Sequence, residues 1–153
     1  MQIEQRLRDL GITLPDAPKP AGNYRAWTQA GRLLFISGQL PLDRGVLRYA
    51  GKVGSDLSEA DGREAARLCA LNVLAQIRAA VETFDRLEGL VRVEGHVNSA
   101  PGWTHQHKVI DGASDLLAQV LGDKANHARA AFGAAELPLN AAVELVVTAQ
   151  VRD

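Results

Sequence analysis

The segment HARAAFGAAELPLNAAVELVV, residues 127–147, contains two strand candidates on either side of a turn. The first candidate, 130–135, consists mainly of small residues, and Leu137-Pro138 turns the chain after it. In the second candidate, 142–151, every second side chain is apolar, as in a strand with one buried face. The segment therefore predicts two consecutive strands, and the second of them has a face suited to a core.

The chain before this segment mixes strands with helices. Further strands are expected at 24–30, 32–37 and 90–98, with a weaker one at 46–53. The apolar residues at 33–36 form a continuous run, which predicts a strand that is buried on both faces. Helices are expected at 2–10, 58–85 and 105–121.

Residues at the ends of these helices support the assignments. Ser58 and Thr104 are the expected N-caps of the second and third helices. Gly11 and Gly122 are the residues expected to end the first and third. Strands mixed with two long helices predict an α+β fold, in which a single mixed sheet carries two helices on one face. The other face of such a sheet is open, and oligomerisation is a common way to bury it.

The composition is that of an ordinary globular protein. With 153 residues, 46% hydrophobic and 23% charged, the sequence predicts one domain spanning 1–153, with 1–14 as an N-terminal helical extension. The net charge of −1 gives no reason to expect nucleic acid or an anionic membrane as a partner. No apolar run approaches the ~20 residues of a membrane helix, and no apolar signal segment is present. A single cysteine makes the reducing cytoplasm the expected location.

Metal and nucleophile chemistry find little support in the sequence. No two histidines have a spacing specific for zinc, and His105 and His107 would point apart on a helix. Cys69 lies among apolar helix positions, which favours a buried structural thiol over a nucleophile. Ser37 is not part of a G-x-S-x-G motif, and no glycine-rich phosphate loop occurs. The sequence therefore predicts no metal site and no organic cofactor.

Two charged residues stand out in the C-terminal strands. Arg129 opens the segment of small residues and is its only cation, and its planar guanidinium can bind a carboxylate bidentately. Glu144 interrupts the apolar run of the final strand and lies on the face opposite to Val143 and Leu145. Each of these charges lies either on a solvated face or at a binding site.

Four segments resemble motifs of the Rid (YjgF-type) family, in its longer subgroup with an extra N-terminal helix. GNY at 22–24 is similar to the family's G-P-Y, with Asn in place of Pro, and FISGQLP at 35–41 is similar to its S-G-Q-x-P strand end. LNVL at 71–74 resembles the centre of its first helix, with Asn72 as the shared residue. Arg129, Leu137-Pro138 and Glu144 resemble its arginine, Leu-Pro turn and acid. The resemblance spans about residues 20–152.

The resemblance implies a chorismate-mutase-like fold and a homotrimer with clefts between subunits. By the same resemblance, Arg129 binds the carboxylate of a small metabolite, and Glu144 places or activates water. Tyr24, Ser37 and Gly38 line the cleft. The family reaction is hydrolysis of a 2-imino or enamine acid to a 2-keto acid and ammonia, so the resemblance implies that the chain is a cofactor-independent deaminase.

Several alternatives stay open beside this interpretation. Asp111 stands where many deaminating members carry an asparagine, and we include it among the substrate-binding candidates. Arg129 and Glu144 could instead simply pair with each other across the subunit contact. A trimer of this fold could also bind a small metabolite and catalyse nothing. Ribonuclease activity, attached to the family through the name endoribonuclease L-PSP, is disfavoured by the balanced charge.

Overall fold

A computed structural model describes residues 2–153. Its elements are α1 (Gln2–Asp9), β1 (Trp27–Ala30), β2 (Leu33–Gln39), β3 (Leu42–Asp43), β4 (Val46–Leu47), α2 (Glu59–Val81), β5 (Leu87–Asn98), α3 (Gln106–Leu121), β6 (Ala128–Ala134) and β7 (Val143–Val151). The main sheet has five strands in the order β1-β2-β7-β5-β6. Only the β5–β6 pair is parallel, so the sheet is mixed and the predicted α+β class is confirmed.

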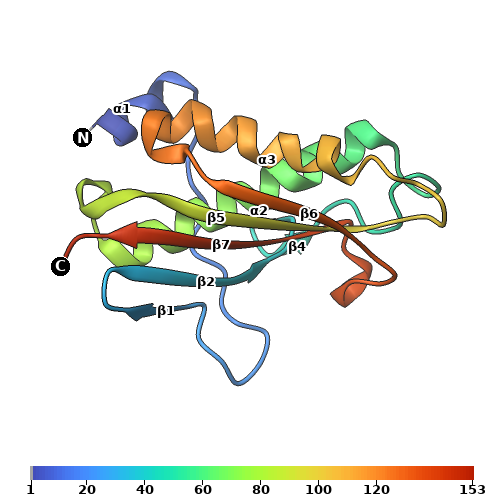
Figure 1. The fold of residues 1–153 in the computed structure, drawn as a ribbon, viewed down its shortest axis with the longest axis horizontal. Helices are drawn as coiled ribbons and strands as arrows, with labels where there is room; N and C mark the ends of the chain where they lie inside the picture. The colour runs from blue at the N-terminus through green and yellow to red at the C-terminus, as the bar shows by residue number, and fades with distance from the viewer. Residues whose placement is uncertain (1) are drawn as a thin grey trace.

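The helices α2 and α3 lie side by side against one face of this sheet, while α1 packs on the outside of α3 (Figure 1). β7 runs between β2 and β5, although it is the last strand in the chain. The prediction of one mixed sheet with two helices on one face is therefore confirmed. Among residues 2–153, no helix combines the length and the apolar character needed to cross a membrane.

The helix α2 begins as the sequence predicts and ends earlier. Ser58 accepts a hydrogen bond from the Asp61 backbone, and the Asp61 side chain accepts one from the Ser58 backbone, which completes a capping box. The predicted end at 85 is wrong, because α2 stops at Val81 and Glu82 takes a positive φ of 64°. Phe84 is still buried, in a 3-10 turn, so the apolar spacing continues past the end of the helix.

The helix α3 lies close to α2. Gly112 makes this possible, because a Cβ at that position would lie 2.9 Å from the backbone carbonyl carbon of Arg63 on α2. The predicted cap at Thr104 is wrong, since His105 occupies the N-cap position and no side chain caps this end. The prediction that Gly122 ends α3 is confirmed.

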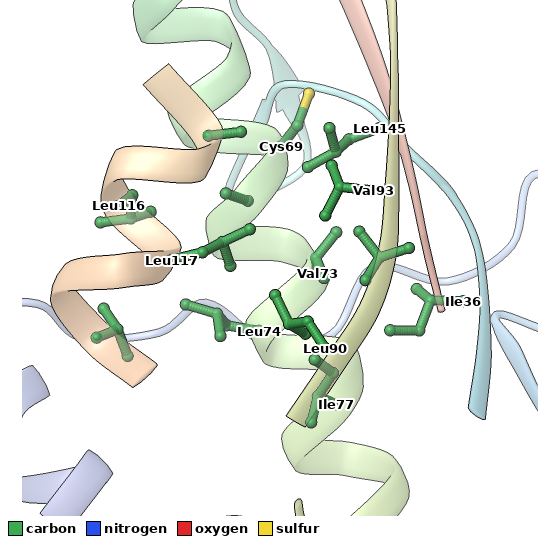
Figure 2. Packing of buried hydrophobic residues seen from close by; sticks show 14 of the residues in the cluster. Ile36, Cys69, Val73, Leu74, Ile77, Leu90, Val93, Leu116, Leu117 and Leu145 are labelled. Atoms are coloured by element: carbon green, nitrogen blue, oxygen red, sulfur yellow. The ribbon is translucent and has the colours of Figure 1, made fainter. Parts of the chain in front are cut away.

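The core fills the space between the two helices and the sheet. Figure 2 shows Leu74 and Ile77 of α2, Leu117 of α3 and Val93 of β5 turned toward one another. Each of these side chains is fully buried, and together with their neighbours they form one continuous cluster. Burying a side chain of this size contributes roughly 1.5–3 kcal/mol. The packing of α2 and α3 on the sheet therefore fixes where each strand residue points.

The opposite face of the sheet is open in the single chain. Leu33 and Phe35 on β2 remain 38% and 43% exposed, whereas Leu34 and Ile36 are buried under the helices. The predicted strand with two buried faces is therefore wrong for one chain, because no element among residues 2–153 covers this side.

Two strand assignments also change. The predicted strand at 24–30 begins only at Trp27, and the one at 46–53 is replaced by the short β3–β4 pair.

Candidate functional site

The end of β2 contains a β-bulge. Ile36 pairs with Val147 and Gln39 pairs with Leu145, so two residues of β2, Ser37 and Gly38, oppose one residue of β7. The hydroxyl of Ser37 donates a hydrogen bond of 2.6 Å to a backbone carbonyl ahead of β1. A bulge turns the strand locally and changes the direction of its side chains, and here it interrupts the regular pairing of β2 with β7.

Two buried amides hold the chain beyond this bulge. Asn72 on α2 donates hydrogen bonds of 3.0 and 2.9 Å to the carbonyls of Leu40 and Leu42. Gln76, one turn later, donates to the carbonyl of Pro18 at 2.7 Å and to the Gln39 amide oxygen at 3.4 Å. These bonds explain physically why an asparagine stands in the middle of α2, where helix propensity alone would disfavour it. They fix the position of the bulge against the helix layer.

Tyr24 lies next to this bulge, outside β1, with 55% of its surface exposed. Together with Ser37, Gly38 and Leu139 it lines a shallow hollow of about 110 Å³. Leu139 has a positive φ of 59° and is the most exposed large apolar side chain among the described residues. Tyr24, Ser37 and Gly38, all expected to line the cleft, are thus brought together.

Glu144 on β7 lies directly against the bulge. A Cβ at Gly38 would lie 2.8 Å from the Glu144 carboxyl carbon, so glycine lets the carboxylate take this position and a larger residue would displace it. Among residues 2–153, no group forms a hydrogen bond or an ion pair with the Glu144 carboxylate. Tyr24, Ser37, Gly38 and Glu144 are called the Glu144 group below. It combines an open hollow with a carboxylate that can accept hydrogen bonds.

Arg129 lies on β6, at the edge of the sheet, and its side chain reaches α3. Its Nη1 donates to Asp111 Oδ1 at 2.8 Å and to Ser114 Oγ at 3.3 Å, and its Nη2 donates to the His107 carbonyl at 3.3 Å. The side chains of Arg129 and Asp111 are 25% and 44% exposed. These two residues are called the Arg129 pair below.

The Arg129 pair and the Glu144 group lie on opposite faces of the sheet. Arg129 is in register with Val93 on β5, which is fully buried under the helices. Glu144 is in register with His96, three positions further along β5 and therefore on the other face. Arg129 accordingly contacts α3, whereas Glu144 is flanked on β7 by residues that point into the core. One chain alone does not bring Arg129 and Glu144 together.

The remaining candidate groups are structural. Cys69 is fully buried and donates a hydrogen bond to the Val143 carbonyl at 3.6 Å. Burial, followed by the nearby negative charge of Glu144, raises the pKa of the Cys69 thiol well above 9.0, so the thiol stays protonated and does not act as a nucleophile. His105 pairs with Glu59 at 2.9 Å, and within residues 2–153 no cluster of three metal-ligating side chains is suited to hold an ion.

Sequence reasoning selected both Asp111 and Arg129 but did not predict that they pair, and it missed the contact of Arg129 with Ser114. Asp111 and Ser114 are three positions apart on α3 and therefore share one helix face, which could have indicated a common partner. His107 contributes a backbone carbonyl, which side-chain identity cannot reveal. His105 and His107 were expected to point apart, yet their rings lie 6.2 Å from each other, because His105 precedes the helix.

Comparison with known proteins places this geometry in a family. Residues 4–151 match the family model described as "YjgF/chorismate mutase-like, putative endoribonuclease". The chain is 42% identical over 145 residues to protein TCP17 of Trypanosoma cruzi, a match that covers 94% of this chain and 91% of that protein.

Two solved structures are similar over nearly the whole chain. Atu1372 of Agrobacterium tumefaciens, described as a protein with unknown function, is 43% identical with a TM-score of 0.89, and the match covers 98% of this chain and 92% of that one. A protein of Shewanella oneidensis described as a "putative endoribonuclease" is 33% identical with a TM-score of 0.95, covering 99% and 100%. The chain therefore belongs to the YjgF/chorismate mutase-like family, the Rid family to which its sequence motifs pointed.

Proposed function

We propose that the protein hydrolyses reactive 2-imino and enamine acids to 2-keto acids and ammonia, in clefts completed by neighbouring copies of the chain. The observation that carries the proposal is that Arg129 retains unused donors and Glu144 retains an unpartnered carboxylate, on opposite faces of one sheet, within residues 2–153. A ligand that touches both groups requires two chains. The placement of Arg129 and Glu144 on opposite faces supports the homotrimer with interfacial clefts that the family resemblance implies.

Arg129 would bind the substrate carboxylate. A guanidinium has five N–H donors, and three of those of Arg129 are used within the chain. The donors that remain are Nε and one hydrogen of Nη2, and these two nitrogens lie on the same side of the guanidinium. Two parallel hydrogen bonds from one side of an arginine fix both the position and the orientation of a carboxylate. The reacting carbon next to that carboxylate would then be held in place as well.

Glu144 would orient the attacking water. Its carboxylate has no partner within residues 2–153, and it lies beside the hollow formed by Tyr24, Ser37 and Gly38. Water adds to the C=N carbon, the C–N bond then breaks, and the nitrogen leaves as ammonia while the oxygen becomes the keto group. Glu144 can accept the proton that water loses and return it to the leaving nitrogen. No metal or organic cofactor takes part in this reaction.

The proposed partners are a small carboxylate and two further copies of the chain, with no nucleic acid and no membrane. The relatives described as endoribonucleases do not change this proposal, because a net charge of −1 offers no electrostatic basis for binding RNA. We place the reaction in the cytoplasm, where a free buried cysteine such as Cys69 remains reduced.

Assembly gives the first test of the proposal. Leu33, Phe35 and Phe132 leave apolar surface on the open face of the sheet, and burying it against other copies stabilises an oligomer. Sedimentation equilibrium should therefore give about three times 16.4 kDa. A monomer that persists at micromolar concentration would contradict both the trimer and the interfacial cleft.

Glu144→Gln tests the proposed role of the acid. The amide keeps the size of the side chain, and thus its fit against Gly38, but it cannot accept a proton from water. The turnover number for 2-iminopropanoate, generated in situ, should fall by about 100-fold, because general-base catalysis contributes roughly 10²–10⁴ in rate. The KM should change by less than about threefold, because the proposed partner of Glu144 is water. An unchanged turnover number in the folded variant would remove Glu144 from the mechanism.

A non-catalytic binding trimer is the second candidate function, and one observation favours it. Asp111 already supplies a carboxylate to Arg129, so in the empty chain the positive charge is balanced. A protein of this kind would bind the same ligands at Arg129 without accelerating imine hydrolysis. The imine assay on the wild-type protein separates the two functions.

A further inference from the structure

The contacts within the chain leave part of the hydrogen-bonding capacity of the Arg129 pair unused. Asp111 Oδ1 accepts from Arg129 Nη1 at 2.8 Å, while Asp111 Oδ2 has no partner among residues 2–153. Arg129 for its part retains Nε and one hydrogen of Nη2. Both side chains are partly exposed. The surface therefore presents an unused carboxylate oxygen beside unused guanidinium donors.

We propose that the Arg129 pair recognises zwitterions, in which a carboxylate binds Arg129 and an adjacent cationic nitrogen binds Asp111 Oδ2. This inference rests on the proposed function only in placing the ligand at Arg129. The chemical class is an acid with a protonated nitrogen on its second carbon, such as a 2-iminium acid or a 2-amino acid. Asp111 is then the residue that selects ligands with a cationic nitrogen over plain anions.

The charges explain why a zwitterion is preferred over a plain anion. A carboxylate without a cationic nitrogen gains the donors of Arg129 but must approach the carboxylate of Asp111, and the two like charges repel each other. In a 2-amino or 2-iminium acid the nitrogen and the carboxylate are attached to the same carbon, so the two opposite charges of the ligand lie side by side, like those of the pair. Hydrogen bonds between charged partners are among the strongest in proteins.

The same arrangement would aid product release. Hydrolysis of a 2-iminium acid removes the cationic nitrogen as ammonium and leaves a 2-keto acid with a single negative charge. That product retains its attraction to Arg129 and loses its contact with Asp111. The substrate is therefore held better than the product, and the 2-keto acid should inhibit the protein only weakly.

A pair of stable three-carbon probes tests this selectivity. Binding of L-alanine, the zwitterion, and of pyruvate, the plain anion, is measured by NMR titration on the wild-type protein at fixed pH and ionic strength. The wild type should bind L-alanine about tenfold more tightly than pyruvate, as expected for one additional hydrogen bond between charged groups. A wild type that binds pyruvate as tightly as L-alanine, or more tightly, would overturn the proposal without any substitution.

Asp111→Asn provides the second measurement, with Asp115→Asn as its control. The introduced amide keeps an oxygen that can accept from Arg129 Nη1, and the substitution removes only the charge. Affinity for pyruvate should rise and affinity for L-alanine should fall, each by about tenfold, so that the preference is reversed. Asp115 lies on the same helix and pairs with Arg63 at 3.5 Å. Its variant removes the same charge without touching the Arg129 pair, so it should keep the wild-type preference.

The outcomes separate this inference from the proposed function. If the wild type prefers L-alanine but does not accelerate imine hydrolysis, the hydrolase is refuted and the zwitterion site is supported. If it hydrolyses the imine but prefers pyruvate, the zwitterion site alone is overturned. A preference that is the same in Asp111→Asn and in the wild type also overturns the role of Asp111.

Discussion

Replacing Arg129 with alanine should abolish imine hydrolysis while leaving the chain folded. The guanidinium bonds only to partly exposed groups on α3, and Asp111, 44% exposed, can be solvated once its partner is gone. Hydrogen bonds to a charged group contribute ~1.5–3 kcal/mol, so carboxylate binding should weaken at least about tenfold. The turnover number should fall as well, because the reacting carbon loses its orientation. Arg129→Lys should recover little, since an ammonium cannot provide two parallel donors.

Arg63→Ala is a matched control for this experiment. Like Arg129, Arg63 contacts α3 from another element. It lies on α2 and forms a hydrogen bond of 3.0 Å to the Lys108 carbonyl and an ion pair with Asp115. The control removes the same kind of contact away from the proposed site, so binding and turnover should be retained. Thermal unfolding and sedimentation report on folding and assembly. If Arg129→Ala unfolds or dissociates the protein, a structural role is indicated. If it turns over imine at the wild-type rate, Arg129 is not part of the site.

Gly112→Ala should destabilise the protein far more than the addition of one methyl group usually does. The added Cβ would lie 2.9 Å from the Arg63 carbonyl carbon, and because this neighbour is backbone, the two helices must separate. Overpacking of this kind costs about 1–3 kcal/mol and occasionally more. At ~2–4 °C per kcal/mol, the melting temperature should fall by roughly 2–12 °C.

Gly89→Ala is the comparison for this loss. A Cβ at Gly89 would find its nearest neighbour at 3.4 Å, so the methyl group fits with little displacement, and the melting temperature should change by no more than a few degrees. Separation of α2 and α3 also displaces Asp111, the residue before Gly112. Folded Gly112→Ala protein should therefore show a weaker preference for zwitterions. A melting temperature equal to that of the wild type would mean that α2 and α3 can shift at no cost.

Local patterns predicted the elements of the fold where neighbouring residues determine them. The alternation in 143–151 predicted the correct buried face, and Ser58 predicted the correct start of α2. The apolar run at 33–36 was misinterpreted, because apolar side chains alone do not reveal whether a face is covered by the same chain or by another. The end of α2 was misplaced because Phe84 is buried outside the helix at helical spacing.

The arrangement of the site depends on topology, which local patterns do not contain. The charge pattern of the C-terminal strands and the family resemblance selected Arg129 and Glu144, and no feature of the sequence indicated that they occupy opposite faces. That relation follows from the parallel pairing of β6 with β5 and the antiparallel pairing of β7 with β5. The ion pair with Asp111 depends likewise on where α3 crosses the edge strand, which is set by the close approach at Gly112.

The central place of β7 has a consequence for how the chain folds during synthesis. Leu33 on β2 pairs with Gln150 on β7, so the two halves of the sheet share a strand that is made after both of them. Until β7 leaves the ribosome, β1–β2 is an isolated hairpin and β5–β6 a two-stranded pair, and such pieces are marginal in water. Contacts this distant in sequence slow folding. Until β7 is available, β2 and β5 have unpaired edges and exposed apolar side chains. The nascent chain is therefore most prone to aggregation between the synthesis of β2 and that of β7.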